Sequence, residues 1–341
     1  MKKLVGLSIT DTHLDDKNID VNISIYKQVA EIALKNNILV IQHLGDIFNK
    51  RKGLPDYLIN VFNEILDDYK SKNLTLSAIK GNHDCTDYAG EISSLLAFKH
   101  HPAFSLIETV GQIAWSEDIT MHLIPFYRES DTYQKYLDMC LEQNDFDYKF
   151  NFLGTHIAID KAQNNDGSLV EGLAHSLFDK FDKVIIGHYH DENQVSDKMW
   201  YCGSSLQHNF GETVHKGCVG YYDDGTCEII PLDFPKYIKH EVNIEDLTPQ
   251  KIVELSKEAE GVDKIRVVLK GESSKMKAFD KSILEDVGVD CKLNSDKVEE
   301  KYVVDEYSNH SAASIKEDFE EFCKENNYDL SIGLKYLNSA L

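Results

Sequence analysis

The sequence predicts an α/β protein with a parallel core sheet, a second sheet packed on the first, a small β-α-β-α-β unit and closing helices. Several observations support this prediction. Short β-rich runs alternate with helical patterns early in the chain, which is typical of βαβ crossovers. Five such runs end in polar residues, and the character of the sequence changes after Pro235. A chain of 341 residues is long enough for one large core and a smaller appendage.

The predicted strands of the large unit each lead into residues with metal-binding or catalytic side chains. The five runs are KKLVGLSI before Asp11 and His13, ILVIQHL before Asp46, LTLSAIK before Asn82 and His83, FNFLG before His156, and KVIIG before His188 and His190. Residues 19–37 and 55–69, between the early strands, carry apolar side chains at helical spacing. In open parallel sheets, ligands bind beyond the carboxyl ends of the strands, so we expect the five polar clusters to meet.

Later segments define the remaining elements. From Ile119 the runs ITMHLIPF and MWYCGS and a hairpin turning at residues 223–225 suggest antiparallel pairing, for which a second sheet is the simplest use. We place the domain limits at residues 1–234, 235–305 and 306–341. The small unit should contain a helix over TPQKIVELSKEAEG, the strand KIRVVLKG, a helix over residues 274–286 and the strand VDCKLNS. The last segment carries a leucine stripe from Leu330 to Leu341.

Composition excludes several classes of protein. Apolar residues make up 42% and charged residues 28%, which argues against disorder and fibres. The net charge of −22 repels nucleic acid unless cations reverse it locally. The first apolar run is too short for a signal peptide, and no run reaches the roughly 18 residues of a membrane span. Seven scattered cysteines without C-x-x-C pairs suit a reducing cytoplasm, where we expect the protein to act.

The converging side chains suggest a metal site. They are Asp11, His13, Asp46, Asn82, His83, His156, His188 and His190. Carboxylate, imidazole and amide ligands without thiolate suit Mn²⁺, Fe²⁺ or Zn²⁺. If seven of these eight side chains act as ligands, they are too many for one ion. They suit two ions about 3.5 to 4 Å apart with a bridging carboxylate. Each motif taken alone is also compatible with an ordinary turn or cap, and their joint occurrence after strands favours the metal hypothesis.

In their order D-x-H, G-D, G-N-H-D, H and G-H-x-H, these motifs resemble the calcineurin-like metallophosphoesterases over Leu4 to His190. The resemblance implies a four-layer α/β/β/α sandwich. It also implies two divalent ions, for which Mn²⁺ is our expectation. Asp11, His13, Asp46 and His190 would hold the first, and Asp46, Asn82, His156 and His188 the second. His83 would be the general acid, oriented by Asp84 unless that carboxylate merely caps its loop.

Flanking segments narrow the resemblance. GDIFNKRKGLPDYL and YCGSSLQHNFGE look like the nuclease subunit of the SbcCD and MRN/MRX DNA-repair complexes, including phage versions. That likeness implies a capping domain over the site, exonuclease and endonuclease activity in DNA repair, recombination or replication, and an SMC-like ATPase partner. It also implies a homodimer within a heterotetramer, with no membrane association.

One departure from that likeness concerns Asn49, where cellular members usually have histidine, which leaves open the balance of the two nuclease activities. Lys50, Arg51 and Lys52 would contact DNA phosphates or form a solvated cluster. The alternatives are an enzyme for small phosphodiesters or cyclic nucleotides and a non-catalytic scaffold. For a scaffold we would expect decayed ligand positions, whereas every position is filled here.

Overall fold

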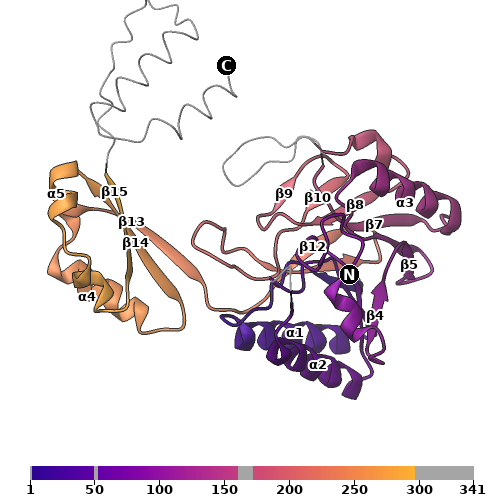
Figure 1. Cartoon of the computed structure of the whole chain (residues 1–341), viewed down its shortest axis with the longest axis horizontal. Helices are drawn as coiled ribbons and strands as arrows, with labels where there is room; N and C mark the ends of the chain where they lie inside the picture. The colour runs from indigo at the N-terminus through magenta and orange to yellow at the C-terminus, as the bar shows by residue number, and fades with distance from the viewer. Residues whose placement is uncertain (1, 50–52, 160–171, 296–341) are drawn as a thin grey trace, which may run out of the picture.

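Two six-stranded sheets lie face to face in the computed structural model, which describes residues 2–49, 53–159 and 172–295 (Figure 1). The first sheet has the order β12-β11-β1-β2-β3-β4 and the second the order β5-β6-β7-β8-β10-β9. The strands of the first are β1 (Leu4–Ile9), β2 (Val40–His43), β3 (Thr75–Ile79), β4 (Phe104–Ile107), β11 (Gly217–Tyr222) and β12 (Cys227–Pro231). Those of the second are β5 (Gly111–Ala114), β6 (Ile119–Ile124), β7 (Phe150–His156), β8 (Lys183–Gly187), β9 (Asn193–Gln194) and β10 (Met199–Tyr201).

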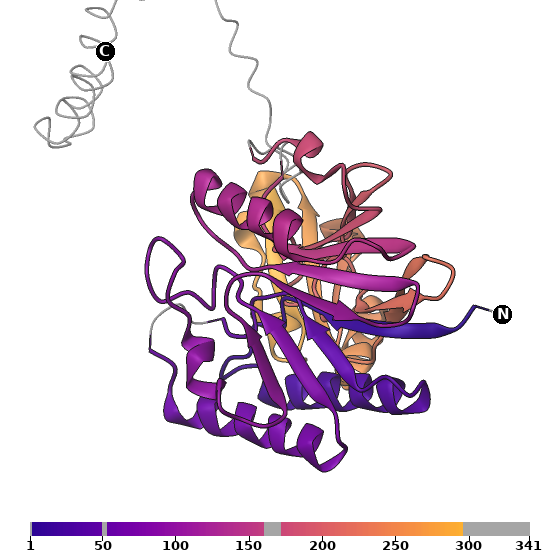
Figure 2. The same ribbon diagram turned by 90° about the vertical axis from the view of Figure 1, so that its right-hand side faces the viewer.

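Helices cover the outer faces of both sheets, as Figure 2 shows. Helices α1 (Ile19–Lys35) and α2 (Asp56–Ser71) pack on the first sheet, and α3 (Ser130–Gln143) packs on the second. The described residues also form three 3₁₀ turns: η1 (Ser94–Phe98), η2 (His175–Phe178) and η3 (Ile244–Asp246). Each interface has its own apolar cluster, and the one between the sheets contains Ile79, Met121 and Phe152. The predicted four-layer α/β/β/α arrangement is confirmed.

The prediction of antiparallel pairing after Ile119 is wrong for the centre of the second sheet. Strands β6, β7, β8 and β10 run parallel to one another, and the edge strands β5 and β9 pair antiparallel with β6 and β10. Helix α3 provides the crossover between β6 and β7 that parallel pairing requires. The predicted hairpin forms between β11 and β12, but it extends the first sheet through β1. The sequence pattern of a hairpin does not show which of the two sheets the hairpin joins.

The small unit is a three-stranded parallel sheet with its own core, separate from the sandwich in Figure 1. It contains β13 (Tyr237–Asn243), α4 (Pro249–Ala259), β14 (Lys264–Gly271), α5 (Ser273–Ala278), α6 (Ser282–Glu285) and β15 (Asp290–Ser295). The single helix predicted over residues 274–286 is wrong. The chain leaves α5 at Phe279, and Asp280 Oδ1 then accepts a 3.0 Å hydrogen bond from the Ser282 N–H at the start of α6.

The domain limits remain predictions, and the predicted helices of residues 306–341, with their leucine stripe, lie outside the described residues. Among the helices that are described, none has both the length and the apolar character needed to cross a membrane.

Candidate metal centre

The five polar clusters predicted at strand ends meet at one edge of the sandwich. Asp11 and His13 follow β1, Asp46 follows β2, and Asn82 and His83 follow β3 in the first sheet. The second sheet supplies His156 at the end of β7 and His188 and His190 after β8. Because β1, β2 and β3 run parallel, and so do β7 and β8, their carboxyl ends lie on the same side. All seven predicted metal ligands are brought together.

The first group of candidate ligands is Asp11, His13, Asp46 and His190. The Nε2 atom of His13 lies 3.1 Å from His190 Nε2, 3.8 Å from Asp11 Oδ1 and 3.6 Å from Asp46 Oδ2. Asp11 and Asp46 are fully buried, and His13 is nearly so. Ligand atoms that each lie about 2.1 Å from one ion are about 3.0 to 3.4 Å apart in octahedral or tetrahedral geometry. The observed separations are close to this range.

The second group is Asp46, Asn82, His156 and His188. Asn82 Oδ1 lies 3.0 Å from His156 Nε2 and 2.8 Å from His188 Nδ1. Asp46 Oδ2 lies 3.4 Å from His156 Nε2. The same oxygen of Asp46 is therefore near imidazole nitrogens of both groups, which is the position of a bridging carboxylate.

Hydrogen bonds outside the two groups orient the imidazole rings for metal binding. The Nδ1–H of His156 donates to the carbonyl of Leu44 at 2.8 Å, and the Nδ1–H of His190 donates to Glu212 Oε1 at 2.9 Å. In each ring the Nε2 lone pair then points into its group. This arrangement, in which the remote nitrogen donates to a carbonyl or carboxylate, is the usual one for metal-binding histidines.

An unsatisfied buried oxygen supports the same interpretation. Asp11 Oδ2 accepts hydrogen bonds from the Thr10 hydroxyl at 2.6 Å and from the His188 N–H at 3.0 Å. Asp11 Oδ1 is buried and has no hydrogen-bond partner among the described residues. Burying a carboxylate oxygen without a donor or cation is costly, and a divalent ion would satisfy it. The donor set and this orphaned oxygen fit a pair of divalent cations.

Burial and mutual charge shift the pKa values of the cluster. Burial raises the pKa of Asp11 and lowers that of His13 well below its ordinary value, so the His13 ring is neutral at pH 7. Burial also lowers the pKa of His188 to about 3. For His156, burial opposes protonation, but the carboxylates of Asp46 and Asp11 raise the pKa to about 9. Neutral His13 and His188 rings can donate lone pairs to a metal without first losing a proton.

The backbone of four candidate ligands is strained. Asp11, His13, Asp46 and His188 have φ angles of 50°, 43°, 56° and 97°, in a region that non-glycine residues rarely adopt. Among the described residues, only Asn37 and Asn73 share this feature outside glycine. Such conformations cost roughly 1 to 3 kcal/mol each and concentrate at functional sites.

Two motif glycines leave room for the candidate ligands. A Cβ atom on Gly81 would lie 2.1 Å from Asp46 Oδ1, and one on Gly45 would lie 2.7 Å from His156 Nδ1. Gly45 also has a φ of +96°, which a side chain would strain. The glycines of the G-D and G-N-H-D motifs therefore allow two loops to approach closely enough for the ligands to meet.

His83 and Asp84, the two predicted catalytic residues, occupy different environments. His83 borders the first group, with its ring centroid 4.7 Å from that of His13, and its Nδ1–H donates to the Asn49 carbonyl at 2.9 Å. Asp84 is fully buried and accepts backbone N–H groups of Asp46, Phe48 and Gly81 at 2.8, 3.1 and 2.9 Å. These contacts match the loop-capping alternative for Asp84, which fixes the loops that carry Asp46 and Asn82.

The predicted DNA-contacting residues are described only in part. Asn49 lies beside His83, and its Nδ2 donates to Asp15 Oδ2 at 2.8 Å. Lys50, Arg51 and Lys52 lie outside the described residues. A groove of about 440 Å³ passes from the site to the small unit. It is lined by His13, Asp15, Lys17, Asn18, Val21, Asn49, His83, His190, Leu206, Gln207, His208, Pro235, Tyr237, Val262 and Lys264.

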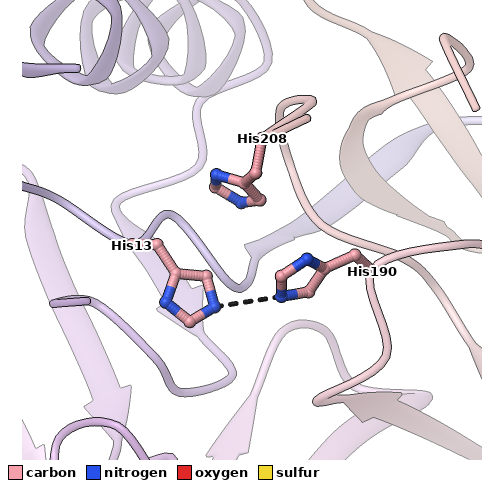
Figure 3. A group of neighbouring side chains, drawn as sticks. All are labelled: His13, His190 and His208. Atoms are coloured by element: carbon pink, nitrogen blue, oxygen red, sulfur yellow. Dashed lines mark hydrogen bonds between the residues drawn. The ribbon is translucent and has the colours of Figure 1, made fainter. Parts of the chain in front are cut away.

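His208 contacts the first group directly. Figure 3 shows its ring beside the His13 and His190 rings, each on a different segment. Its centroid lies 5.0 Å from that of His13 and 4.9 Å from that of His190, and its Nε2–H donates to the Asp11 carbonyl at 2.8 Å. Glu212, which the sequence analysis did not single out, holds His190. His208 and Glu212 both lie in the segment YCGSSLQHNFGE, which comes after the G-H-x-H motif in the sequence. That position is the sequence signal that could have identified them.

Comparison with known proteins gives limited similarity. No family model matches the chain. Among solved structures, the chain is similar to a crystal structure of a dimetal phosphatase from Danio rerio. The match has 11% sequence identity and a TM-score of 0.38, and it covers 65% of this chain and 94% of that one.

Proposed function

We propose that this protein is a two-metal phosphodiesterase that cleaves DNA as an exonuclease and endonuclease, with Mn²⁺ as the cofactor. The observation that carries the proposal is the position of Asp46. Its Oδ2 atom lies 3.6 Å from His13 Nε2 in the first group and 3.4 Å from His156 Nε2 in the second. One carboxylate between two sets of imidazole and oxygen ligands is the arrangement that a pair of divalent ions requires.

The residues of the site divide the chemistry between them. Asp11, His13, Asp46 and His190 would hold one ion, and Asp46, Asn82, His156 and His188 the other. When bound, such ions supply positive charge that activates water and stabilises a phosphoryl transition state. His83 would give a proton to the departing oxygen, and the Asn49 carbonyl would hold its ring in place through Nδ1–H at 2.9 Å. Asp84 would keep the Asp46 and Asn82 loops together through its three backbone hydrogen bonds.

Two features favour DNA as the substrate, and the charge of the chain adds a condition. The segments around Asp46 and after His190 resemble those of SbcCD-type and MRN-type nucleases. The groove beside His83 extends to Tyr237 and Lys264 of the small unit, so an extended substrate would contact both units. Because the chain carries a net charge of −22, affinity for DNA should depend on the bound ions and on a more basic partner. We therefore propose a complex with an SMC-like ATPase, containing two copies of this chain, that acts in DNA repair, recombination or replication in the cytoplasm.

A nuclease assay tests this proposal. Single-stranded and double-stranded DNA would be incubated with the protein and Mn²⁺, Mg²⁺ or a chelator, with and without an SMC-like ATPase. We expect Mn²⁺-dependent cleavage that the chelator abolishes and the ATPase increases on double-stranded DNA. Absence of DNA cleavage under every condition, in protein shown to bind two Mn²⁺ ions, would contradict the DNA proposal.

The second candidate function is hydrolysis of small phosphodiesters or cyclic nucleotides. The acidic net charge and the small number of described basic residues in the groove, Lys17 and Lys264, favour it. Cleavage of bis(p-nitrophenyl) phosphate or a cyclic nucleotide, together with no cleavage of DNA, would select this function over the first.

A further inference from the structure

Residues 207–212, which we call the clasp segment, contact both the first group of candidate ligands and the small unit. On the side of the site, His208 Nε2–H donates to the Asp11 carbonyl at 2.8 Å, and Glu212 Oε1 accepts from His190 Nδ1–H at 2.9 Å. Within the segment, Glu212 Oε2 accepts from the His208 N–H at 3.0 Å. The segment thus holds two residues of the first group, Asp11 through its backbone and His190 through its ring.

On its other side the clasp segment holds the beginning of β13. Gln207 Oε1 accepts the Tyr237 N–H at 2.8 Å, and Gln207 Nε2 donates to the Tyr237 carbonyl at 3.0 Å. Gln207 is only 3% exposed, so both bonds are partly shielded from water. The Phe210 ring lies edge to face with the Tyr237 ring, with 5.0 Å between the ring centroids. The Arg266 guanidinium lies over the Phe210 ring, 4.1 Å from its centroid. Tyr237 and Arg266 both belong to the small sheet.

We infer that the clasp segment couples the docking of the small unit to metal binding at the first group, an inference that depends on the proposed metal function. Displacing β13 would release Gln207 and Phe210, and the segment would then hold the Asp11 carbonyl and the His190 ring less rigidly. Supporting residues of this kind change metal affinity by about 10- to 100-fold when they are removed. Among the described residues the second group makes no hydrogen bond with the segment, so its affinity should stay unchanged. Because such coupling is reciprocal, metal binding should also stabilise the docked small unit.

A second glutamine provides a matched control. Gln28 on α1 makes the same two kinds of hydrogen bond to the chain just before the small unit. Its Oε1 accepts the Asp233 N–H at 2.8 Å, and its Nε2 donates to the Asp233 carbonyl at 2.8 Å. Gln28 does not line the groove, and its side-chain hydrogen bonds go to Ser24 and Asp233, outside both ligand groups. Gln28→Ala therefore removes two hydrogen bonds of the same kind, here to Asp233, and leaves the clasp segment unchanged.

Calorimetric titration with Mn²⁺ tests the inference on the full chain. We expect Phe210→Ala and Gln207→Ala each to weaken one of two binding steps by about tenfold and to leave the other within twofold. Gln28→Ala should leave both steps unchanged. The weakened step is assigned to the first group if it is the one that His190→Gln removes. Phe210→Ala is decisive, because Phe210 is only partly buried and its ring contacts Tyr237 and Arg266 of the small unit, so an effect on metal binding must pass through the clasp segment.

Hydrogen exchange provides a second measurement. Saturating Mn²⁺ should slow exchange at residues 237–243 in the unmodified protein, and this effect should be lost in Phe210→Ala. Two unchanged binding steps in Phe210→Ala, or an equal loss in Gln28→Ala, would overturn the inference. Failure of the unmodified protein to bind two Mn²⁺ ions would instead overturn the proposed function.

Discussion

The Nδ1–H of His83 donates a 2.9 Å hydrogen bond to the backbone carbonyl of Asn49. This bond holds the ring at the wall of the groove, beside His13 of the first group. Because the acceptor is a backbone carbonyl, a change of the Asn49 side chain leaves it in place. The side chain that the substrate meets at position 49 can therefore vary independently of the orientation of His83.

Replacement of His83 by Gln should separate binding from turnover. Glutamine preserves a polar side chain but cannot transfer a proton at neutral pH. We expect the variant to bind two Mn²⁺ ions and DNA as the unmodified protein does, with turnover reduced by about 10² to 10⁴. Steady-state rates on a model phosphodiester and on DNA measure the change. An unchanged rate would show that another group protonates the leaving oxygen.

The bridging position of Asp46 predicts an unequal effect of two ligand substitutions. Asp46→Asn should weaken both metal-binding steps, because Asp46 Oδ2 lies near His13 and His156 alike. His190→Gln should weaken only the first, since His190 contacts His13 on that side. Titration of each variant with Mn²⁺ gives the stoichiometry. Loss of a single site in Asp46→Asn would show that this carboxylate does not bridge.

Gly81→Ala should displace Asp46. The added Cβ would lie 2.1 Å from Asp46 Oδ1, a distance that real structures do not tolerate, so the loop or the carboxylate must move. We expect loss of both Mn²⁺-binding steps and destabilisation of about 1 to 3 kcal/mol, the usual cost of overpacking. Urea unfolding and metal titration measure these effects. Gly261→Ala is the control, because the nearest atom to its added Cβ is 3.4 Å away, and it should change neither quantity.

Acid should destabilise the metal-free protein partly through His43. Burial lowers the pKa of His43 to about 3 in the folded chain, below its ordinary value of 6.5. The unfolded chain therefore takes up a proton between pH 6.5 and 3 that the folded chain does not. The contribution of His43 to stability is complete above pH 6.5 and is lost as the pH falls toward 3. The slope approaches about 1.4 kcal/mol per pH unit.

Urea unfolding in chelator at pH 7.5 and 5.0 tests this dependence. His43→Asn retains an acceptor for the Gly45 N–H, which bonds His43 Nδ1 at 3.2 Å. Between the two pH values, this variant should lose about 2 kcal/mol less stability than the unmodified protein. His100→Asn, at an exposed histidine, should lose as much as the unmodified protein. Equal losses in all three proteins would show that His43 does not contribute.

Removal of residues 311–341 should separate partner binding from catalysis. If the leucine stripe from Leu330 to Leu341 binds the SMC-like ATPase, the truncated chain will fail to co-purify with it. Hydrolysis of a small phosphodiester should continue, because every candidate ligand lies before residue 191. Co-purification of the truncated chain with the ATPase would place the partner surface elsewhere. Loss of hydrolysis together with unfolding would remove the support for a separate partner segment.

Local pattern predicted the parts of the site that depend on a single strand end. Asp11, Asp46 and His156 each follow a β-rich run, and parallel strands necessarily bring such ends together. Contacts between segments that are far apart in the sequence could not be predicted from local pattern. His208 and Asp11 are 197 positions apart in the sequence. The side chain of Gln207 bonds the backbone of Tyr237, and a contact of this kind leaves no periodic pattern in the sequence. The same holds for Asp84, whose role depends on backbone N–H groups 36 and 38 positions away.

The second sheet shows a related limit. Its central strands are buried on both faces, so their sequences lack the alternation that distinguishes one pairing direction from the other. The direction follows from the crossover through α3 and from the return of β10 beside β8, and both depend on packing.

Under the proposed function, the left-handed backbone of Asp11, His13, Asp46 and His188 means that the metal site lowers the heat resistance of the protein. Glycine adopts such angles without strain. A version converted to glycine at one of these positions, such as His188, would lose a candidate metal ligand yet should melt at a higher temperature in chelator. Glycine substitutions at these four positions are therefore the first to test when the sandwich is needed only as a thermally stable scaffold.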